Sequence, residues 1–341
     1  MSDGTPGDGS TDRAEAFREG LHRRAAALRR RIGFPELHDE RIRAAIGELE
    51  DRGWMEPVGV AAPDDPGADP SALAGTPVLG PGDTGESLPP EARESSLLLA
   101  VHLLRDGVLD GVVAGAATAS ARIVRAGLDV LGTAPGVETV SSSFYMILRE
   151  PTAAGDGVLT FTDAGVVPDP TPGQLVEIAM AASDARRKIV GDEPRVAFLS
   201  YSTKGSAGGD SVERMRAAAE AFRERRPDVV ADGELQGDAA LVPDVARRKS
   251  PDSPVEGRAS VLVFPDLDAA NISYKLVQRL GGAMALGPIL QGFPRALNDL
   301  SRGTSVEEIV DVACITALET APSPGEGPDG SSAGGLGPGS G

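Results

Sequence analysis

A turn near the C-terminal end of the sequence contains side chains that can bind an anion. The segment "GPILQGFPRALNDLSRGTSVEEIV" at 287–310 places Ser301 and Arg302 just before an apolar, helix-like stretch. An arginine can bind phosphate through two parallel hydrogen bonds, and a serine hydroxyl can donate another. The Ser-Arg pair therefore predicts an anion-binding turn.

The helix after this turn is expected to begin with two acids. Thr304 or Ser305 can cap it, and Glu307 and Glu308 then fall in its first turn. Acids in a first turn commonly complement the helix dipole, so we expect one of this pair to do only that.

A second candidate is the glycine-rich segment "SYSTKGSAGGDS" at 200–211, which follows a strand-like run and precedes a helical one. Backbone N–H groups and a helix dipole can hold an anion at such a turn. The segment lacks the Gly-Lys-Ser/Thr ending of a P-loop, and a purely structural turn is an equal alternative. The side chains of Ser202, Thr203 and Lys204 favour binding slightly.

A third candidate is "FPDLDAANISYK" at 264–275, which places Asp266, Asp268 and Asn271 just after a β-rich run. Ligands gather at the carboxyl ends of parallel strands. The alternative is that Asp268 and Asn271 cap the next helix, and the residues alone favour capping. Either interpretation places the segment at the functional end of a strand.

The elements that position these segments alternate between strand-like and helix-like patterns. Strand-like runs at 110–115, 195–200 and 259–266 are each followed by a helix-like run. This alternation predicts an α/β fold with parallel sheets. Between residues 60 and 90, the many Gly and Pro residues predict loops.

The chain ends carry different signals. Gly, Ser, Pro and Asp dominate residues 1–12 and 321–341, which predicts two disordered tails. Between them, Phe17, Leu21 and Leu28 stand near helical spacing and predict a first helix over 12–31.

Composition excludes several classes of protein. The net charge of −18 opposes binding to nucleic acid and to anionic membranes, and the sequence has no run of about 18 apolar residues. One cysteine, Cys314, excludes an internal disulfide, and three histidines without ligand spacing predict no metal site. The first residues lack a secretory pattern, so we expect a cytoplasmic protein.

The acidity is accompanied by few lysines and few aromatic residues. Only four lysines occur among 33 basic residues, and aromatic residues make up 4% of the chain. An ordinary acidic protein from a GC-rich genome is one explanation. The combination favours a protein adapted to a salty, haloarchaeal type of cytoplasm.

The segments singled out above resemble the phosphate acetyl/butyryltransferase family. Members of this family carry a closely similar run to "VFPDLDAANISYKLVQR" and "GPILQGFPRALNDLSRG" of this chain. The resemblance extends over roughly 31–318 and is weakest between 47 and 97. Further matching segments are "RIGFPELHDERIRAA", "GTAPGVETVSSSFYMIL", "DPTPGQLVEIA", "LSYSTKGS", "DGELQGDAALVPDVA" and "GRASV".

The resemblance implies a two-domain α/β/α fold related to the isocitrate/isopropylmalate dehydrogenase type, with the active site in the interdomain cleft. One domain would comprise 14–136 plus 296–320 and the other 137–295. The usual assembly is a homodimer. The expected site therefore lies where the chain returns across the cleft.

The resemblance also assigns roles to individual residues. Ser301 and Arg302 match the family's active-site pair, and Arg125 matches a substrate-binding arginine. Glu308 stands where the family often has an aspartate as the proposed base. The substrate-binding set implied by the matching motifs is Arg125, Ser202, Thr203, Lys204, Asp266, Asn271, Tyr274 and Lys275.

Two departures from the family pattern stand out. The "Arg-Lys-x-Lys-Gly" segment that many members carry before the helix equivalent to 97–104 is missing or shortened, and Arg93 is the candidate replacement for its arginine. A family cysteine corresponds to Ala164 here.

The implied reaction is attack of the coenzyme A thiolate on the carbonyl of acetyl phosphate in a ternary complex. Coenzyme A and acetyl phosphate are then substrates, and no tightly bound cofactor is expected. A phosphate butyryltransferase and a noncatalytic acetyl-CoA-sensing regulatory domain are the alternatives. A decarboxylating dehydrogenase would need nicotinamide and metal sites, which the sequence does not display.

The net charge predicts a response to salt. At low ionic strength, acidic groups repel one another and also repel anionic substrates, whereas in molar salt the Debye length falls to about 3 Å. Melting temperature and activity should both rise from dilute buffer to molar potassium chloride, measured on one preparation. Full stability in dilute buffer, with activity that falls as salt is added, would contradict the halophilic interpretation.

Overall fold

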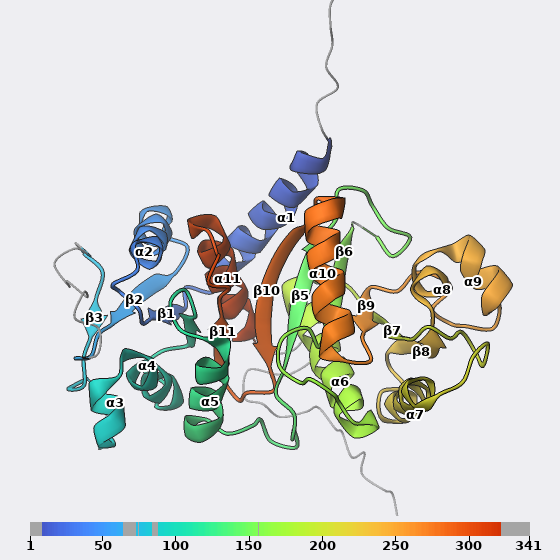
Figure 1. Cartoon of the computed structure of the whole chain (residues 1–341). Helices are drawn as coiled ribbons and strands as arrows, with labels where there is room; N and C mark the ends of the chain where they lie inside the picture. The colour runs from blue at the N-terminus through green and yellow to red at the C-terminus, as the bar shows by residue number, and fades with distance from the viewer. Residues whose placement is uncertain (1–8, 64–72, 74, 84–87, 156, 322–341) are drawn as a thin grey trace, which may run out of the picture.

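The computed structural model describes residues 9–63, 73, 75–83, 88–155 and 157–321. Two β-sheets with helices packed around them form the molecule (Figure 1). This arrangement confirms the predicted α/β class. Within the described residues, no helix combines the length and apolar character needed to cross a bilayer.

The first sheet is parallel throughout, and its strands come from both ends of the chain. Strand β11 is the last strand in the sequence, yet it pairs with β4 of the first sheet. The chain therefore returns to the first sheet after it has formed the second. In spatial order the strands are β11 (Ala296–Asp299), β4 (Gly111–Ala114), β1 (Arg31–Phe34), β2 (Glu56–Val60) and β3 (Val78–Leu79).

The second sheet contains one strand, β5, that runs opposite to its neighbours. A short connection joins β5 to β6, and such a connection produces an antiparallel pair. The alternating pattern of the sequence did not predict this reversal. In spatial order the strands are β10 (Met284–Gln291), β5 (Ser141–Ile147), β6 (Val158–Thr162), β9 (Val261–Val263), β7 (Arg195–Leu199) and β8 (Val230–Leu235).

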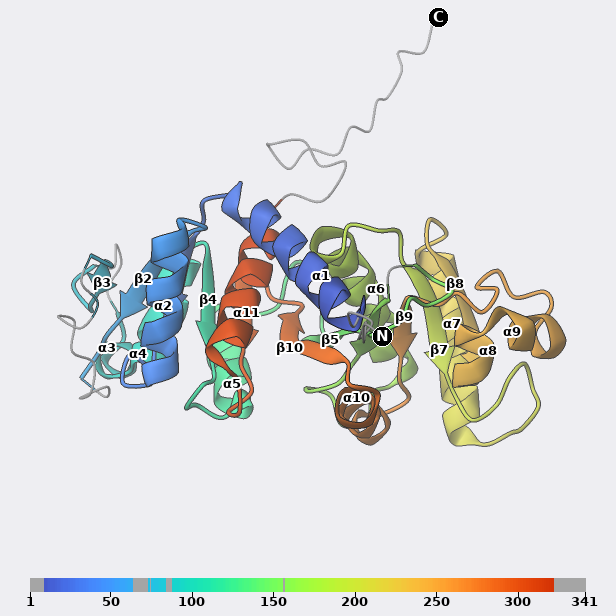
Figure 2. The same ribbon diagram turned by 90° about the horizontal axis from the view of Figure 1, so that it is seen from above.

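Helices cover both sheets, as Figures 1 and 2 show. The longest are amphipathic or buried, and two of them, α6 and α11, begin with a capping box. They are α1 (Gly9–Ala26), α2 (Glu40–Arg52), α3 (Pro90–Glu94), α4 (Ser96–Arg105), α5 (Ser120–Val130), α6 (Pro172–Ile189), α7 (Asp210–Arg225), α8 (Gly237–Leu241), α9 (Pro243–Lys249), α10 (Leu267–Gly281) and α11 (Val306–Glu319).

The N-terminal helix differs from its prediction at both ends. It begins at Gly9, so residues 9–12 are helical and do not belong to a tail. These polar residues extend the helix because a run of strong helix formers follows them. It ends at Ala26 instead of Arg31, because Arg29 adopts a left-handed conformation and the chain turns into β1. The remaining tail residues, 1–8 and 322–341, lie outside the described part.

Helix α11 lies between the two sheets (Figures 1 and 2). Every residue from Ile309 to Leu318 is buried, including Cys314. One continuous core joins Phe34 of the first sheet and Tyr145 of the second through Ile315 of α11. The two sheets therefore share a hydrophobic core across this helix.

Helix α1 is fixed to α11 by both apolar and charged contacts. Leu21 is fully buried against the shared core. The buried carboxylate of Asp311 lies 2.8 Å from Arg18 Nε and 2.6 Å from His22 Nε2. A buried carboxylate needs such partners, so α1 is an integral part of the structure.

Candidate active site

Three parallel strands of the first sheet end beside one another at the Ser-Arg turn. Asp299 pairs with Ala114, and the Leu300 N–H donates to the Ala114 carbonyl (2.8 Å). At Gly115, which has φ of 116°, a Cβ atom would lie 2.3 Å from Asp299 Oδ1. Only glycine allows β4 and β11 to approach so closely at this edge.

The carboxylate of Glu36, just after β1, organises the loop that follows β4. It accepts four backbone N–H groups, those of residues 115–118, at 2.7–3.2 Å. Nearby, burial raises the pKa of Asp299 to about 7, and the Glu36 charge acts in the same direction. Sequence reasoning missed Glu36, since a single acid after a strand carries no motif.

Arg41 of α2 fixes the Ser-Arg turn from the other side. Its Nη1 donates to the carbonyls of Arg302 (2.9 Å) and Thr304 (3.0 Å), and its Nη2 donates to Ala116 (2.8 Å). Hydrogen bonds with Asp39 hold the guanidinium in place and raise its pKa. Arg41 thus joins the turn to the loop after β4. It was not predicted, because its role depends on contacts with residues 261 positions away.

Ser305 is the cap of α11, one of the two candidates from sequence. Its hydroxyl accepts the Glu308 N–H (3.2 Å), and Glu308 Oε2 accepts the Ser305 N–H (3.0 Å). Glu307 is exposed on the helix surface. Glu308 thus completes a capping box and also lines the cavity described next.

A cavity of about 320 Å³ lies between α10, β10 and the first turn of α11. We call it the Ser301 cavity. Its lining includes four of the predicted site residues, Ser301 and Glu308 from the turn and α11, and Tyr274 and Lys275 from α10. Arg279 and Gln278 of α10 also line it, and sequence reasoning did not single them out.

An aromatic pair forms one wall of the Ser301 cavity. Phe144 of β5 stacks on Tyr274 with ring centroids 3.9 Å apart. Lys275 Nζ donates to the Tyr274 hydroxyl (2.5 Å) and lies 4.5 Å from its ring centroid. The wall therefore combines an apolar surface with a cation.

None of the three predicted arginines lines this cavity. The Arg302 side chain is exposed on the turn beside it. Arg125 is 77% exposed on α5, where Asp129 lies 3.7 Å away. Arg93 lies on α3 and donates to the Leu88 carbonyl (3.3 Å).

Asp266 and Asn271 occupy structural positions around α10. Asp266 caps the helix by accepting the Ala269 N–H (2.8 Å). The segment therefore does contain a helix cap, but the capping residue is Asp266 and not Asp268 or Asn271. Asn271 donates to the carbonyl of Ala164 (3.4 Å). Neither lines the Ser301 cavity.

The glycine-rich loop after β7 is bound to carboxylates of β8. Glu234 Oε1 accepts the Gly205 N–H (2.7 Å) and the Ser202 hydroxyl (3.0 Å), and Lys204 pairs with Asp232. Burial opposes ionisation, but hydrogen bonds from Arg216 and from Gly205 lower the pKa of Glu234 to about 2. The Ser202 hydroxyl, the Gly205 N–H and the Lys204 ammonium are thus already paired.

Two further observations concern this loop and metal ions. Thr203 donates to Gln236 Oε1 (3.2 Å), so Ser202, Thr203 and Lys204 all contact β8 or the residue after it, and none lines the Ser301 cavity. Among the described residues, no group of three or more His, Cys, Asp or Glu side chains is placed to hold a metal.

The family model described as phosphate acetyl/butaryl transferase matches residues 86–317. The chain belongs to the phosphate acetyl/butyryltransferase family. Membership confirms the resemblance found in the sequence motifs.

Related proteins match over most of the chain. A phosphate acetyltransferase of Treponema pallidum is 50% identical over 234 residues, which cover 67% of this chain and 69% of that protein. One from Paracoccus denitrificans is 41% identical over 312 residues, covering 88% of this chain and 98% of that protein. Among solved structures, a Streptococcus pyogenes phosphotransacetylase superposes with a TM-score of 0.80 at 34% identity, covering 90% and 98% of the two chains.

The contacts of Arg41 predict how the Ser-Arg turn responds to mutation. Replacing the guanidinium in Arg41→Gln removes the charged donors to residues 302 and 304, each worth about 1.5–3 kcal/mol. Amide hydrogen exchange of a peptide spanning 301–305 should accelerate at least about tenfold. Arg52→Gln, on the exposed face of the same helix, is the control and should leave this peptide unchanged. Equal exchange in both variants would show that Arg41 does not hold the turn.

Proposed function

We propose that this protein is a phosphate acetyltransferase that transfers acetyl reversibly between acetyl phosphate and the thiol of coenzyme A. The main support is the Ser301 cavity, which gathers a hydroxyl, a carboxylate and the cations of α10 in a chain of this family. Relatives up to 50% identical carry the name phosphate acetyltransferase. Both substrates are anions, and no tightly bound cofactor is needed.

In this mechanism Glu308 is the base that accepts the thiol proton. Oε2 of its carboxylate accepts the Ser305 N–H, while Oε1 accepts no hydrogen bond from the described residues. The capping box holds the side chain in one orientation and leaves an oxygen free. A carboxylate held in this way can accept a proton without first reorganising.

Ser301 and Arg302 act on the acetyl phosphate. The Ser301 hydroxyl donates to the oxyanion of the tetrahedral intermediate, and the Arg302 guanidinium offsets the phosphate charge from the mouth of the cavity. Lys275 and Arg279 add positive charge on the opposite wall. Neither Arg125 nor Arg93 lines the cavity. In this proposal Arg125 contacts the substrates once they are bound, and Arg93 is the weaker candidate for the same role.

The remaining predicted residues contribute to coenzyme A binding in this proposal. Tyr274 offers an aromatic edge of the cavity, and Asp266 and Asn271 hold the start of α10, on which Tyr274 and Lys275 lie. The loop with Ser202, Thr203 and Lys204 does not line the cavity in this proposal. It contributes to coenzyme A binding through the conformation in which its contacts with Glu234 and Asp232 hold it.

We further propose that the two sheets mark two domains, 14–136 plus 296–320 and 137–295, in a cytoplasmic enzyme. The Ser301 cavity supports this division, because its lining comes from β10 of one sheet and from the turn after β11 of the other.

A homodimer is the proposed assembly, and α10 carries the surface that supports it. Ile272, Leu276 and Leu280 are 57%, 52% and 83% exposed at a spacing of four residues, which places them on one helix face. Exposed apolar side chains grouped in this way mark contact surfaces. The opposite side of α10 lines the Ser301 cavity, so a second copy docked here would support that wall.

The activity is tested by following absorbance at 233 nm as thioester forms from acetyl phosphate and coenzyme A. Butyryl phosphate in parallel measures the acyl-chain preference. Faster turnover with butyryl phosphate would make the chain a butyryltransferase, and no turnover with either would favour a noncatalytic regulatory domain.

The two neighbouring glutamates provide a matched pair of variants. If Glu308 is the base, Glu308→Gln should lower kcat about 100-fold or more with little change in coenzyme A affinity, because the amide cannot accept the proton. Glu307→Gln is the control and should retain normal kinetics. Arg302→Lys should also impair turnover, since an ammonium cannot reproduce two-point phosphate binding. Interchanged effects of the two glutamine variants would assign the base to Glu307.

The α10 surface predicts how the assembly responds to mutation. Leu276→Asp combined with Leu280→Asp should convert a species of twice the 35.0 kDa chain mass into a monomer, measured by light scattering after gel filtration. Leu128→Asp, at an exposed leucine of α5, is the control and should leave the mass unchanged. A wild-type monomer would contradict the dimer proposal.

A further inference from the structure

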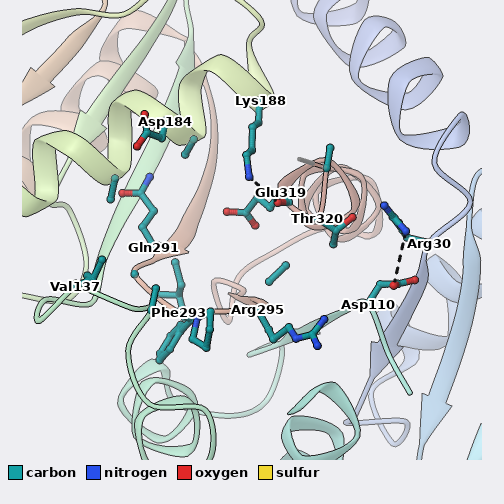
Figure 3. A pocket seen from close by; sticks show the side chains of 18 residues that line it. Arg30, Asp110, Val137, Asp184, Lys188, Gln291, Phe293, Arg295, Glu319 and Thr320 are labelled. Carbon is teal, nitrogen blue, oxygen red and sulfur yellow. Dashed lines mark hydrogen bonds and ion pairs between the residues drawn. The ribbon is translucent and has the colours of Figure 1, made fainter. Parts of the chain in front are cut away.

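A second and larger cavity, of about 560 Å³, lies at the opposite edge of the first sheet (Figure 3). We call it the Arg295 cavity. Arg30, Asp110 and Ala296 line it where β1, β4 and β11 begin, whereas the Ser301 turn follows the end of β11. Lys188 of α6 and Gln291 of β10 complete it from the second sheet. A cavity of this size suits a small metabolite.

Three cations around this cavity have unused hydrogen-bond donors. Arg295 has no hydrogen bond or ion pair within the described part of the chain. Arg30 Nε is buried without an acceptor, and the nearest carboxylate oxygen, on Asp110, is 3.9 Å from its Nη1. Lys188 Nζ donates only to the backbone carbonyl of Glu319 (3.2 Å). A buried donor without an acceptor is costly, so Arg30 Nε is suited to an external anion. The exposed guanidinium of Arg295 and the half-buried ammonium of Lys188 line the same cavity.

Each carboxylate around the cavity has at least one partner, and Asp110 is also the ion-pair partner of Arg30 (3.9 Å). Asp184 pairs with Arg226 (3.0 Å), and Asp110 accepts the N–H of the first residue of β1 (2.8 Å). Glu319 accepts the amide of Asn298 (2.5 Å), and burial raises its pKa to about 7. Lys188 and Arg295 form no ion pair with a carboxylate of the described residues, so they give this cavity available positive charge in a chain whose net charge is −18.

Figure 3 shows how these groups are arranged. Lys188 and Arg295 lie on opposite sides of the space, with Glu319 between them, and Arg30 lies beside α11. A ligand with two separated negative groups is therefore suited to contact Lys188 and Arg295 together.

We propose that the Arg295 cavity is a binding site for a small polyanionic metabolite with two or more phosphoryl or carboxylate groups. Guanidinium groups bind both kinds of anion through paired hydrogen bonds. The site is separate from the Ser301 cavity and acts as an effector site for it.

Two elements connect the cavities. Helix α11 contributes Glu308 and Val312 to the Ser301 cavity, and its last residue, Glu319, lines the Arg295 cavity together with the following Thr320. Its 14 residues span about 20 Å. Strand β10 likewise lines one cavity with residues 285–287 and the other with 290–291. A ligand that moves the end of α11 therefore also acts on Glu308, and this coupling rests on the proposed function.

Binding is tested by titration calorimetry of the full chain with inorganic pyrophosphate and with tricarballylate, at constant ionic strength. At least one probe should bind the wild-type protein. Arg295→Gln and Lys188→Gln should each weaken this binding at least about tenfold, because each removes a charged donor. Glu319→Gln should strengthen it about threefold at pH 8, because a negative charge is lost while the acceptor for Asn298 remains.

Two controls separate this site from general charge effects and from the Ser301 cavity. Arg248→Gln removes an exposed arginine of α9 that does not line either cavity, and it should leave affinity unchanged. Arg302→Gln should also leave it unchanged. Binding that survives Arg295→Gln, binding that is lost in Arg302→Gln, or no binding at millimolar concentration would each overturn the proposal.

The coupling has its own readout. A saturating concentration of the bound probe should change kcat of thioester formation in the wild-type protein and not in Arg295→Gln. An unchanged kcat in both would overturn the effector role. If the wild-type chain forms no thioester, the proposed function fails, whereas the calorimetric comparison still decides whether the site exists.

Discussion

The burial of α11 between the two sheets is the constraint on which the rest of the structure depends. A helix buried on all sides requires apolar partners on each side, and here β1 and α2 supply one side and β10 and α6 the other. The same helix presents its first turn to the Ser301 cavity and its last turn to the Arg295 cavity. The core that joins the sheets thus also sets the distance between the two cavities.

Buried or half-buried carboxylates are the second feature that fixes the structure, because they accept hydrogen bonds from backbone N–H groups of the loops. Glu36 holds the loop after β4, Glu234 holds the loop after β7, and Asp163 accepts the N–H groups of Ser142, Gly165 and Val167. Such bonds satisfy buried N–H groups where strands end and no ladder partner is available. In an acidic protein, some of the negative charge therefore serves to fix the loops.

The sequence alone determined much of the fold class and part of the site. The alternating patterns predicted the α/β class with parallel pairing, through one strand of the first sheet, β4, and two of the second, β7 and β9. The motif around Ser301, Arg302 and Glu308 indicated the family. Ser301, Glu308, Tyr274 and Lys275 do line one cavity, because the long motif places two of them on α10, one in the turn after β11 and one in the first turn of α11. The reversal of β5 and the extent of α1 were not predicted, since both depend on connections and contacts rather than on local propensity.

Only the tertiary structure decided how the remaining polar residues are used. Arg41 and Glu36 act on residues that are distant in sequence, and the donors of the 202–205 loop face carboxylates of β8 instead of an open anion site. The Arg295 cavity likewise exists only where β1, β4 and β11 begin beside α6. The physical reason is that hydrogen-bond partners and burial depend on which segments the fold brings together, whereas local spacing fixes only the helix or strand on which a side chain lies.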